Sequence, residues 1–569
     1  MPRISRRAGI GTLAGLLASV ALVLTVKSVP APLLVLLGAG IGAFLVIVSH
    51  RERMGYVDNL MASAAMGVPL WAVFSLVVFP FFSAWSMEWS ADAVRGHFPE
   101  LVGWVGFRAV LGLALQGLSA LADRVLGPEP EAAEAAMPKK RRVVILGGGF
   151  AGMQTAASLE HELRGDPSVS ITLVSETNAL LFTPMLAEVA GSSLEPGHIS
   201  TPLRTSVRSA AFVRGRVQSV VLEKRCVLLE PEAAPGQAPE APRALEFDHL
   251  VLALGAVSNF HGMENIEKQS FNFKSLLDAI RIRNHVIEMF ERADREKDRA
   301  TRRGLLTFVV AGGGFAGVEL AGALNDFSRG ILADYPNLQS EDLNIVLVHS
   351  RDTILPELSA SLGEYARRSM EARGVTFKLN TRLLDARPGT VVLSDGELPA
   401  ATLVWTAGVA PNPLLATLPY PRDKRGAVIV ETTMAVPGAP GIWAVGDCAA
   451  LNDGKTGKPC PPTAQFALRE ANTLARNIKA SLAGKPLKPF HFDSLGALCV
   501  VGHQTACAEL TVPFARQKSM RFSGLLAWLM WRGIYLGKLP GIERKVRVLL
   551  DWTIELFFPK DVVQTIDLA

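Results

Sequence analysis

The sequence predicts an α/β protein over most of its length, preceded by an all-α transmembrane module, and three observations lead to this fold class. The hexapeptide GGGFAG occurs at 147–152 and again at 312–317, each time after a short apolar, β-branched run. Residues 1–126 contain four apolar stretches of about the length that a membrane-crossing helix needs. Residues 521–561 have the spacing of amphipathic helices.

Length and composition set the frame for these features. A chain of 569 residues exceeds one ordinary core, so several domains are expected. With 49% hydrophobic and 20% charged residues and a mean hydropathy of +0.27, the composition favours a membrane protein. The net charge of +5 is scattered, without a dense basic tract, which argues against nucleic-acid binding. The basic residues near apolar segments suit anionic lipid headgroups.

The cysteines indicate a reducing environment. There are five, an odd number, without the spacing of a metal site. We interpret them as reduced thiols of a cytosol-facing protein and expect no metal. They are Cys226, Cys448, Cys460, Cys499 and Cys507.

Four spans are predicted at the N-terminus, namely Ala8–Val26, Ala31–Val48, Leu60–Trp85 and Leu101–Leu121. Basic residues before the first span and between the second and third place the N-terminus and everything after residue 127 inside. The alternative is a twin-arginine signal peptide at SRRAGIG, which the later spans and a poor cleavage site oppose. Arg108 has an interhelical or snorkelling role in this interpretation. Residues 127–140, rich in Pro, Ala and Glu, form a linker.

The first glycine turn has the context of a dinucleotide site. RRVVIL predicts a buried parallel strand, after which Gly147 makes the turn, Gly149 admits a pyrophosphate and Gly152 allows close helix packing. The helix that follows offers unpaired N–H groups at its N-terminus. The next strand, SITLVSE, ends at Glu176, a position suited to hold an adenosine ribose; Ser175 occupies the usual position of the acid.

The second turn repeats this design with the strand LLTFVVA and the glycines Gly312, Gly314 and Gly317. The alternative for either copy is a glycine turn that binds nothing. Two complete strand–turn–helix copies favour two bound dinucleotides instead.

The two dinucleotides are expected to differ. GIWAVGDCAAL is a strand that ends in Gly446 and Asp447, and a carboxylate there can accept hydrogen bonds from the ribitol hydroxyls that FAD has and NAD lacks. HLVLALGAVSN and LVWTAGVAPN are two further strands that reach glycine turns. These interrupted pieces indicate a first domain split by an insertion at about 272–405.

Residues from Arg141 to about Gln564 resemble the type II NADH dehydrogenases, single-chain NADH:quinone oxidoreductases that contain FAD. The resemblance rests on GGGFAG followed by LLFTPMLAEVAG, on GGGFAGVE, on AVGDCA and on PTAQFALREA. It implies two Rossmann-like domains of the glutathione reductase type, with FAD in the first and NAD(P)H in the inserted one. Residues 1–126 lie outside the usual family pattern.

The predicted domains follow from the motifs and the resemblance together. They are a transmembrane module (1–126), a linker (127–140), an FAD-binding domain in two parts (141–271 and 406–515), an NAD(P)H-binding domain (272–405) and a C-terminal membrane-association region (516–569).

The resemblance also implies the cofactor-binding residues. Those for FAD are Gly147, Gly149, Phe150, Ala151, Gly152, Glu176, Ala253, Gly255, Gly446, Asp447 and Ala464. Those for NAD(P)H are Gly312, Gly314, Gly317, Glu319, His349, Arg351, Ala407 and Gly408.

Two residues are implied in the chemistry. Glu319 matches the family's GxxGxE glutamate and is expected near the nicotinamide–flavin contact; its alternative role is capping of its own helix. Gln465, within Thr463–Phe466, matches the wall between flavin and quinone channel and could bond a quinone carbonyl. The alternative there is an ordinary helix start after Pro461–Pro462. The family has Gln where this chain has Arg469 or Glu470.

One departure from the family concerns the electron donor. NADH-preferring members carry an acid after the second strand of the inserted domain, where this chain has His349, Ser350 and Arg351. Because an arginine among neutral neighbours can accept a 2′-phosphate, we expect NADPH to be used at least comparably to NADH.

The C-terminal region predicts a pair of interfacial helices. Tryptophans 528, 531 and 552 are expected at the headgroup boundary. One helical face carries Val546, Leu549, Leu550, Thr553, Leu556 and Phe557. The alternative is a core or dimer-contact helix, so the expected partners are a quinone, the lipid bilayer and, as a homodimer, a second copy.

The predicted activity is hydride transfer from NAD(P)H to FAD and two-electron reduction of a quinone in a respiratory chain. The enzyme is expected on the cytoplasmic side of a prokaryotic plasma membrane, in a multi-pass protein. One alternative is a sulfide:quinone oxidoreductase, which would need placed redox cysteines. A disulfide reductase would need a cysteine pair after the first fingerprint. The other alternative is a flavin-based redox sensor or scaffold that signals through the spans.

Overall fold

The structure is a computed structural model that describes residues 2–27, 29–48, 63–64, 66–80, 96–126, 140–231, 242–511 and 519–564. It divides into two compact units, residues 1–136 and 137–569. The predicted linker residues 127–139 and residues 81–95 lie outside the described residues.

The first unit is helical. Its helices are α1 (Pro2–Thr25), α2 (Ala31–Val48), α4 (Gly67–Val73), which continues as the π-helical η1 (Phe74–Val78), and α7 (Phe98–Leu126). Among the described residues, Phe98–Ala122 is the one helical stretch both long and apolar enough to cross a membrane. Shorter apolar helices fall within the other three predicted spans, the third of which is described only in part. The structure therefore supports one span by length and composition, fewer than the four predicted.

Small residues let α1 and α2 pack closely. A Cβ built on Gly15 would collide with the carbonyl of Gly38, and one on Gly11 would lie 2.5 Å from the Gly42 carbonyl oxygen. Large apolar side chains on this unit point outward instead: Leu36 is 72% exposed and Val102 is 70% exposed.

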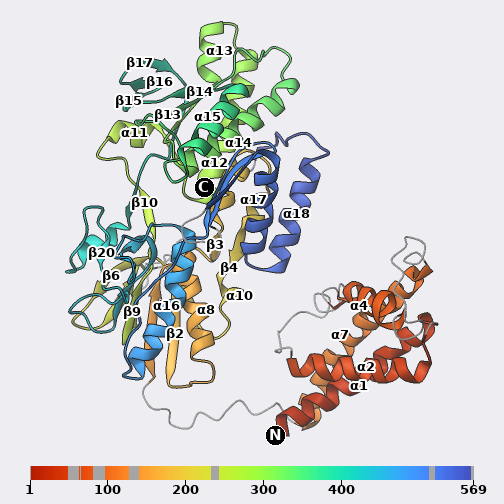
Figure 1. Ribbon diagram of the computed structural model, residues 1–569. Helices are drawn as coiled ribbons and strands as arrows, with labels where there is room; N and C mark the ends of the chain where they lie inside the picture. Colours follow the sequence, from red (N-terminus) through yellow and green to blue (C-terminus); the bar gives the residue numbers. More distant parts are fainter. Residues whose placement is uncertain are drawn as a thin grey trace. The chain divides into compact units, whose positions relative to one another are not determined.

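The second unit contains two parallel sheets of the same design (Figure 1). The first has the order β21-β9-β1-β2-β5 and the second β11-β18-β12-β13-β14. Each centres on the strand that precedes a glycine turn, which is β1 or β12. The strands of the first are β1 (Arg141–Leu146), β2 (Val169–Ser175), β5 (Ala211–Arg214), β9 (His249–Leu252) and β21 (Ile442–Ala444). Those of the second are β11 (Phe271–Asn272), β12 (Thr307–Ala311), β13 (Asn344–Val348), β14 (Val375–Lys378) and β18 (Thr402–Trp405).

Each parallel sheet has a three-stranded antiparallel sheet inserted in the chain, before β9 in the first and before β18 in the second. The first insertion is β6 (Val217–Val221), β7 (Cys226–Leu229) and β8 (Arg243–Glu246), and the second is β15 (Leu383–Arg387), β16 (Thr390–Leu393) and β17 (Gly396–Pro399). Short antiparallel pairs are β3 (Ala179–Leu181) with β4 (Ser200–Pro202) and β10 (Ala256–Ser258) with β19 (Val409–Pro411). The repeat of the two parallel sheets agrees with the α/β fold predicted from the two fingerprints.

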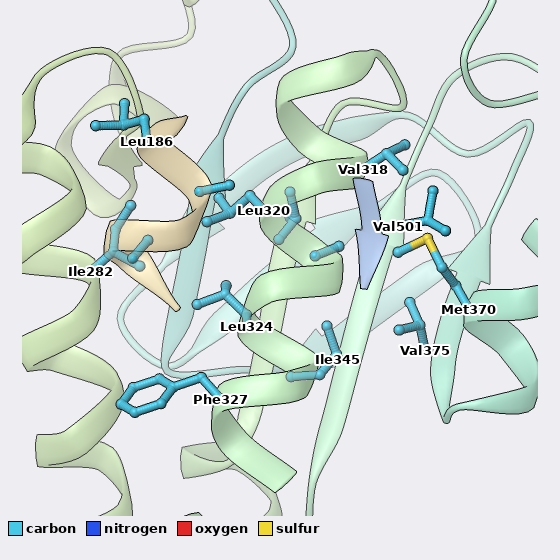
Figure 2. Packing of buried hydrophobic residues seen from close by; sticks show 14 of the residues in the cluster. Leu186, Ile282, Val318, Leu320, Leu324, Phe327, Ile345, Met370, Val375 and Val501 are labelled. Carbon is cyan, nitrogen blue, oxygen red and sulfur yellow. The ribbon is translucent and has the colours of Figure 1, made fainter. Parts of the chain in front are cut away.

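Helices cover the two parallel sheets. The first sheet carries α8 (Phe150–Glu162) and α16 (Ala464–Leu482), which pack against each other. The second carries α12 (Leu276–Arg295), α14 (Phe315–Ile331) and α15 (Ala360–Ala372). The short α9 (Leu186–Ala190) follows β3 and packs against α14. Figure 2 shows Leu186 and Ile282 on one side of α14 and Val501 on the other.

The C-terminal part is an antiparallel sheet with two helices beside it. The sheet is β23 (Gly496–Gly502), β24 (Thr505–Thr511) and β25 (Ser519–Ser523). Helices α17 (Gly524–Lys538) and α18 (Ile542–Glu555) follow, in dark blue in Figure 1.

The three tryptophans of this part correct one prediction. Trp528, Trp531 and Trp552 are 6%, 1% and 4% exposed, inside the core that α17 and α18 share with α14 and β23. They therefore do not reach a headgroup boundary, because they pack α17 and α18 against the rest of their own domain. Leu549, Leu550 and Phe557 are 52%, 55% and 77% exposed, so the opposite face of α18 is apolar and open.

Candidate functional site

The first glycine turn has the shape of a diphosphate cradle. Gly147 has a φ of +112°, and a Cβ there would collide with the carbonyl of Ala253. A Cβ on Gly152 would collide with the carbonyl of Gly147, so β1 and α8 are in close contact. Gly149 faces open space, with no atom within 4 Å of a Cβ built on it. No described side chain caps α8, which leaves its first N–H groups free for an anion.

The carboxyl ends of β1, β9 and β21 bring the other predicted FAD residues to the same edge of the sheet. Gly446 lies between two helices, since a Cβ there would lie 3.1 Å from the Ala151 side chain and 3.7 Å from that of Ala467. Asp447 follows it, beside the start of α16 at Ala464. Burial raises the pKa of Asp447, and Lys274 and Arg425 oppose that shift. Phe150 packs edge-to-face on Phe182, with ring centres 5.8 Å apart.

Two predicted residues at this site are held by neighbours. Glu176 directly follows β2 and is paired with Arg216 at 3.2 Å, with both side chains more than half exposed. Gly255 has a φ of +67°, and its carbonyl accepts a hydrogen bond from the backbone N–H of Asn412, where the chain re-enters the first domain.

The second glycine turn repeats the first in detail. Gly312 has a φ of +128°, and a Cβ there would press on Thr406 and on the backbone of Ala407. A Cβ on Gly317 would collide with the carbonyl of Gly312. Gly314 precedes α14, which no described side chain caps. Gly408 lies against Asn259, whose backbone N–H donates to the Gly408 carbonyl at 3.1 Å.

His349 is tied to this turn. Its Nδ1 accepts the backbone N–H of Gly313 at 3.1 Å, so the neutral ring carries its proton on Nε2. That Nε2 atom is buried and has no hydrogen-bond partner among the described residues. Burial lowers the pKa of His349, and the nearby Arg351 lowers it further, so the ring is neutral at neutral pH. Arg351 itself is exposed.

Glu319 does not cap its own helix. Its Oε1 accepts the backbone N–H of Val500 at 3.2 Å, which joins the first turn of α14 to β23. Burial raises the pKa of Glu319 to about 8, Glu188 adds to the rise, and the Val500 N–H and the Trp531 indole oppose it. The carboxyl is therefore largely protonated at neutral pH.

Gln465 is positioned by the segment that leads into β23. Its Oε1 accepts the N–H of Leu495 at 3.2 Å, and its Nε2 donates to the Gly496 carbonyl at 3.4 Å. Thr463 caps α16 by accepting the N–H of Phe466 at 3.4 Å, as an ordinary helix start would require. One N–H of the Gln465 amide is left for a further acceptor.

The sequence interpretation missed two acidic residues. Glu470 is 3% exposed and accepts the N–H of Gly446 at 2.9 Å. Its position on the apolar face of α16, beside Phe466 and Ala467, was a usable signal. Glu188 lines a pocket together with Glu319 and Arg532. It is the only charged residue in the apolar run PMLAEVAG.

Two uncapped glycine turns on two parallel sheets of the same design are the geometry of a protein with two dinucleotide sites. In agreement, residues 141–471 match the family model of pyridine nucleotide-disulphide oxidoreductases, and residues 495–561 match that of the NDH2 C-terminal domain.

Proteins of similar sequence identify the family within this class. The chain is 31% identical to the type II NADH:quinone oxidoreductase Ndh of Mycobacterium tuberculosis, over 73% of this chain and 88% of that one. It is 26% identical to the external alternative NADH-ubiquinone oxidoreductase of Yarrowia lipolytica, over 75% and 81% of the two chains. The chain therefore belongs to the family of type II NADH:quinone oxidoreductases, which is an enzyme family that uses FAD and NADH.

Solved structures agree on the fold. That of NDH2 from Plasmodium falciparum in complex with NADH has a TM-score of 0.66 at 18% identity, over 74% of this chain and 100% of that one. The sulfide:quinone oxidoreductase of Aquifex aeolicus has a TM-score of 0.55 at 20% identity, over 74% and 95%, and so shares the fold alone.

Proposed function

We propose that the protein is an NAD(P)H:quinone oxidoreductase whose two glycine turns bind different dinucleotides. Residues 141–271 with 406–515 hold FAD, and residues 272–405 hold the nicotinamide dinucleotide. FAD supplies the two-electron carrier between donor and quinone. The observation that carries the assignment is Asp447, a carboxylate beside the first turn that can accept hydrogen bonds from ribitol hydroxyls.

The residues of the first turn would bind and orient FAD. The N–H groups at the start of α8 hold its diphosphate, with Gly147 and Gly152 closing the turn around Gly149. Glu176 accepts hydrogen bonds from the adenosine ribose. Phe150, Ala151, Ala253, Gly255, Gly446 and Ala464 line the site and exclude water.

The residues of the second turn would bind the electron donor. Gly312, Gly314 and Gly317 shape its diphosphate site, and Ala407 and Gly408 border it. We assign Arg351 as the residue that binds the 2′-phosphate of NADPH. The buried Nε2–H of His349, which has no hydrogen-bond partner among the described residues, is a second donor to that phosphate. A ribose 2′-OH can use the same His349 donor, so NADH and NADPH are both substrates.

Quinone would meet the site beside Gln465. The remaining N–H of its amide can donate to a quinone carbonyl, while Leu495 and Gly496 fix the side chain. Glu319 is on the donor side, at the first turn of α14, where its proton is close to the redox centre.

We further infer that the protein is multi-pass and works on the cytoplasmic side of a membrane. The outward-facing apolar residues of α1, α2 and α7 support a lipid environment for the first unit. The open face of α18 supports a second contact with the bilayer, from which the quinone is drawn. The same face could instead join two copies, and cross-linking in lipid nanodiscs distinguishes the two arrangements.

The experiment that tests the function is a donor-by-quinone activity grid on the detergent-purified, FAD-loaded protein. Turnover with NADH and NADPH and a soluble quinone is expected. Slow turnover with every donor, accompanied only by a spectral shift on nucleotide binding, would contradict the enzyme assignment.

A further inference from the structure

Four helices of the second unit, α9, α14, α17 and α18, contribute side chains to one pocket. It is lined by Glu188 of α9, by Glu319 of α14 and by Trp531 and Arg532 of α17, with Glu555 of α18 at its edge. The pocket has room for water and lies behind the second glycine turn, since Glu319 is in the first turn of α14.

Glu188 is held in this pocket by residues far along the chain. The indole N–H of Trp552 donates to Glu188 Oε2 at 3.0 Å. The Arg532 guanidinium is stacked over Trp528 and Trp552, at 3.9 Å and 4.6 Å from the ring centres. Arg532 also pairs with Glu555 at 2.8 Å, but its Nε is buried and has no hydrogen-bond partner among the described residues. Such a donor in a polar pocket favours ordered water.

The reaction needs a proton route to this region. In NAD(P)H + H⁺ + quinone → NAD(P)⁺ + quinol, the donor supplies one hydride and the solvent supplies one proton in each turnover. Glu319 is only partly exposed and lies at this pocket beside α9, β23 and α17, so a neighbouring acid is well placed to restore its proton.

We propose that Glu188 is that neighbour: it passes a proton through the pocket to the Glu319 carboxylate and is itself reprotonated from water. No electron moves in this step, since one O–H bond breaks at Glu188 as one forms at Glu319. The proposal rests on the function above, because the step matters only if the enzyme reduces quinone.

The charges around Glu188 suit such a carrier. Burial raises the pKa of Glu188 to about 7, Arg532 opposes the shift and Glu555 reinforces it. Burial alone would raise the pKa of Glu555 as well, but Lys560, Ser193 and Arg532 together lower it, so Glu555 stays charged. The charged and titratable groups that face this region from the packed elements are Glu319 and Asp326 of α14, Arg283 of α12, Cys499 of β23, His503 after β23, Arg532 and Tyr535 of α17, Glu555 of α18, and Lys560 and Asp561 of the tail.

The alternative is a purely structural role, in which Glu188 only fastens α18 to α9. Glu188→Gln separates the two, because the amide oxygen still accepts the Trp552 N–H while the titrating group is lost. Glu188→Asp keeps a carboxyl at a shorter reach. Glu195→Gln, an exposed residue after α9, is the charge-matched control.

The test is the pH dependence of turnover in the full-length, FAD-loaded protein with a soluble quinone. We expect Glu188→Gln to be nearly as fast as wild type near pH 6 and about tenfold slower near pH 8, where water is a poor proton source. Imidazole, a small buffer acid, should restore part of the rate, and Glu188→Asp should be intermediate. A loss that is the same at every pH, or that imidazole leaves unchanged, overturns the proposal, as does the absence of a loss.

A second readout needs no turnover. Infrared spectroscopy of the resting protein near neutral pH should detect, beside the signal of protonated Glu319, a second protonated-carboxyl band that is missing in Glu188→Gln and present in Glu195→Gln. A wild-type protein that fails to reduce quinone would remove the proposed function, whereas an unchanged infrared band in Glu188→Gln would remove the carrier role alone.

Discussion

The side chain of Glu470 accepts a hydrogen bond from the backbone N–H of Gly446 at 2.9 Å, so α16 holds the turn that presents Asp447. Gly446 has a φ of +69°, a conformation that glycine adopts without steric cost. Burial raises the pKa of Glu470 to about 7, the Gly446 N–H opposes that shift, and Asp447 adds to it.

Removing this acceptor should weaken the FAD site. Glu470→Ala leaves a buried N–H unpaired, which costs about 1–3 kcal/mol, and should lower the amount of FAD that co-purifies with the protein. Glu470→Gln keeps an oxygen acceptor and should retain FAD. The measurement is the FAD-to-protein ratio together with thermal unfolding, and Arg476→Ala on the exposed face of α16 is the control. Full FAD content in Glu470→Ala would show that the bond is dispensable.

Stability should fall as the pH rises from about 5 to about 8. The pKa values of Glu188 and Glu319 are raised from 4.5 to about 7 and about 8, so the folded state binds more protons than the unfolded state within this window. The stabilisation is complete at low pH and is lost as each folded carboxyl ionises. Chemical denaturation at several pH values should show a shallower decline in the Glu188→Gln, Glu319→Gln double variant. An equal slope in the two proteins would contradict the assignment.

Donor choice should respond to Arg351. Arg351→Gln removes the proposed partner of the 2′-phosphate and should raise the KM for NADPH about tenfold, with little effect on NADH. His349→Glu should shift the preference further toward NADH by repelling the phosphate. Values of kcat/KM for the two donors decide the matter, with the exposed Arg382→Gln as control. A wild-type enzyme that strongly prefers NADH would contradict the proposal.

Quinone delivery should depend on the open face of α18. Leu550→Glu places a charge on that face and should reduce turnover with a long-chain quinone in liposomes. Turnover with a short, soluble quinone should stay unchanged, because the redox site is not altered. Lys424→Glu, exposed elsewhere on the unit, is the control. An equal loss with both quinones would indicate damage to the fold instead of lost lipid contact.

Local chemistry explains which features could be predicted. The strand, the glycine turn and the helix at Gly147 and at Gly312 are contiguous in the chain, so they follow from the sequence motif. Their distant contacts, with Ala253 and with Thr406, do not. Trp552 could not be placed that way, because its partner Glu188 is 364 residues away. The amphipathic pattern of α18 identified an apolar face correctly but could not tell which apolar residues its own domain would cover.

The same limit applies to the site. The position of Gln465 was predicted from its motif, but its hydrogen bonds to 494–496 depend on how β23 packs beside α16. The four-span prediction rested on hydropathy, and among the described residues the structure has one helix that meets both length and composition.

The most direct test of the central claim is anaerobic absorbance spectroscopy of the purified, full-length protein. Two dinucleotide sites working in series predict that NADH or NADPH bleaches the bound flavin and that added quinone restores its colour. A protein that binds no flavin, or whose flavin neither donor reduces, would contradict the account.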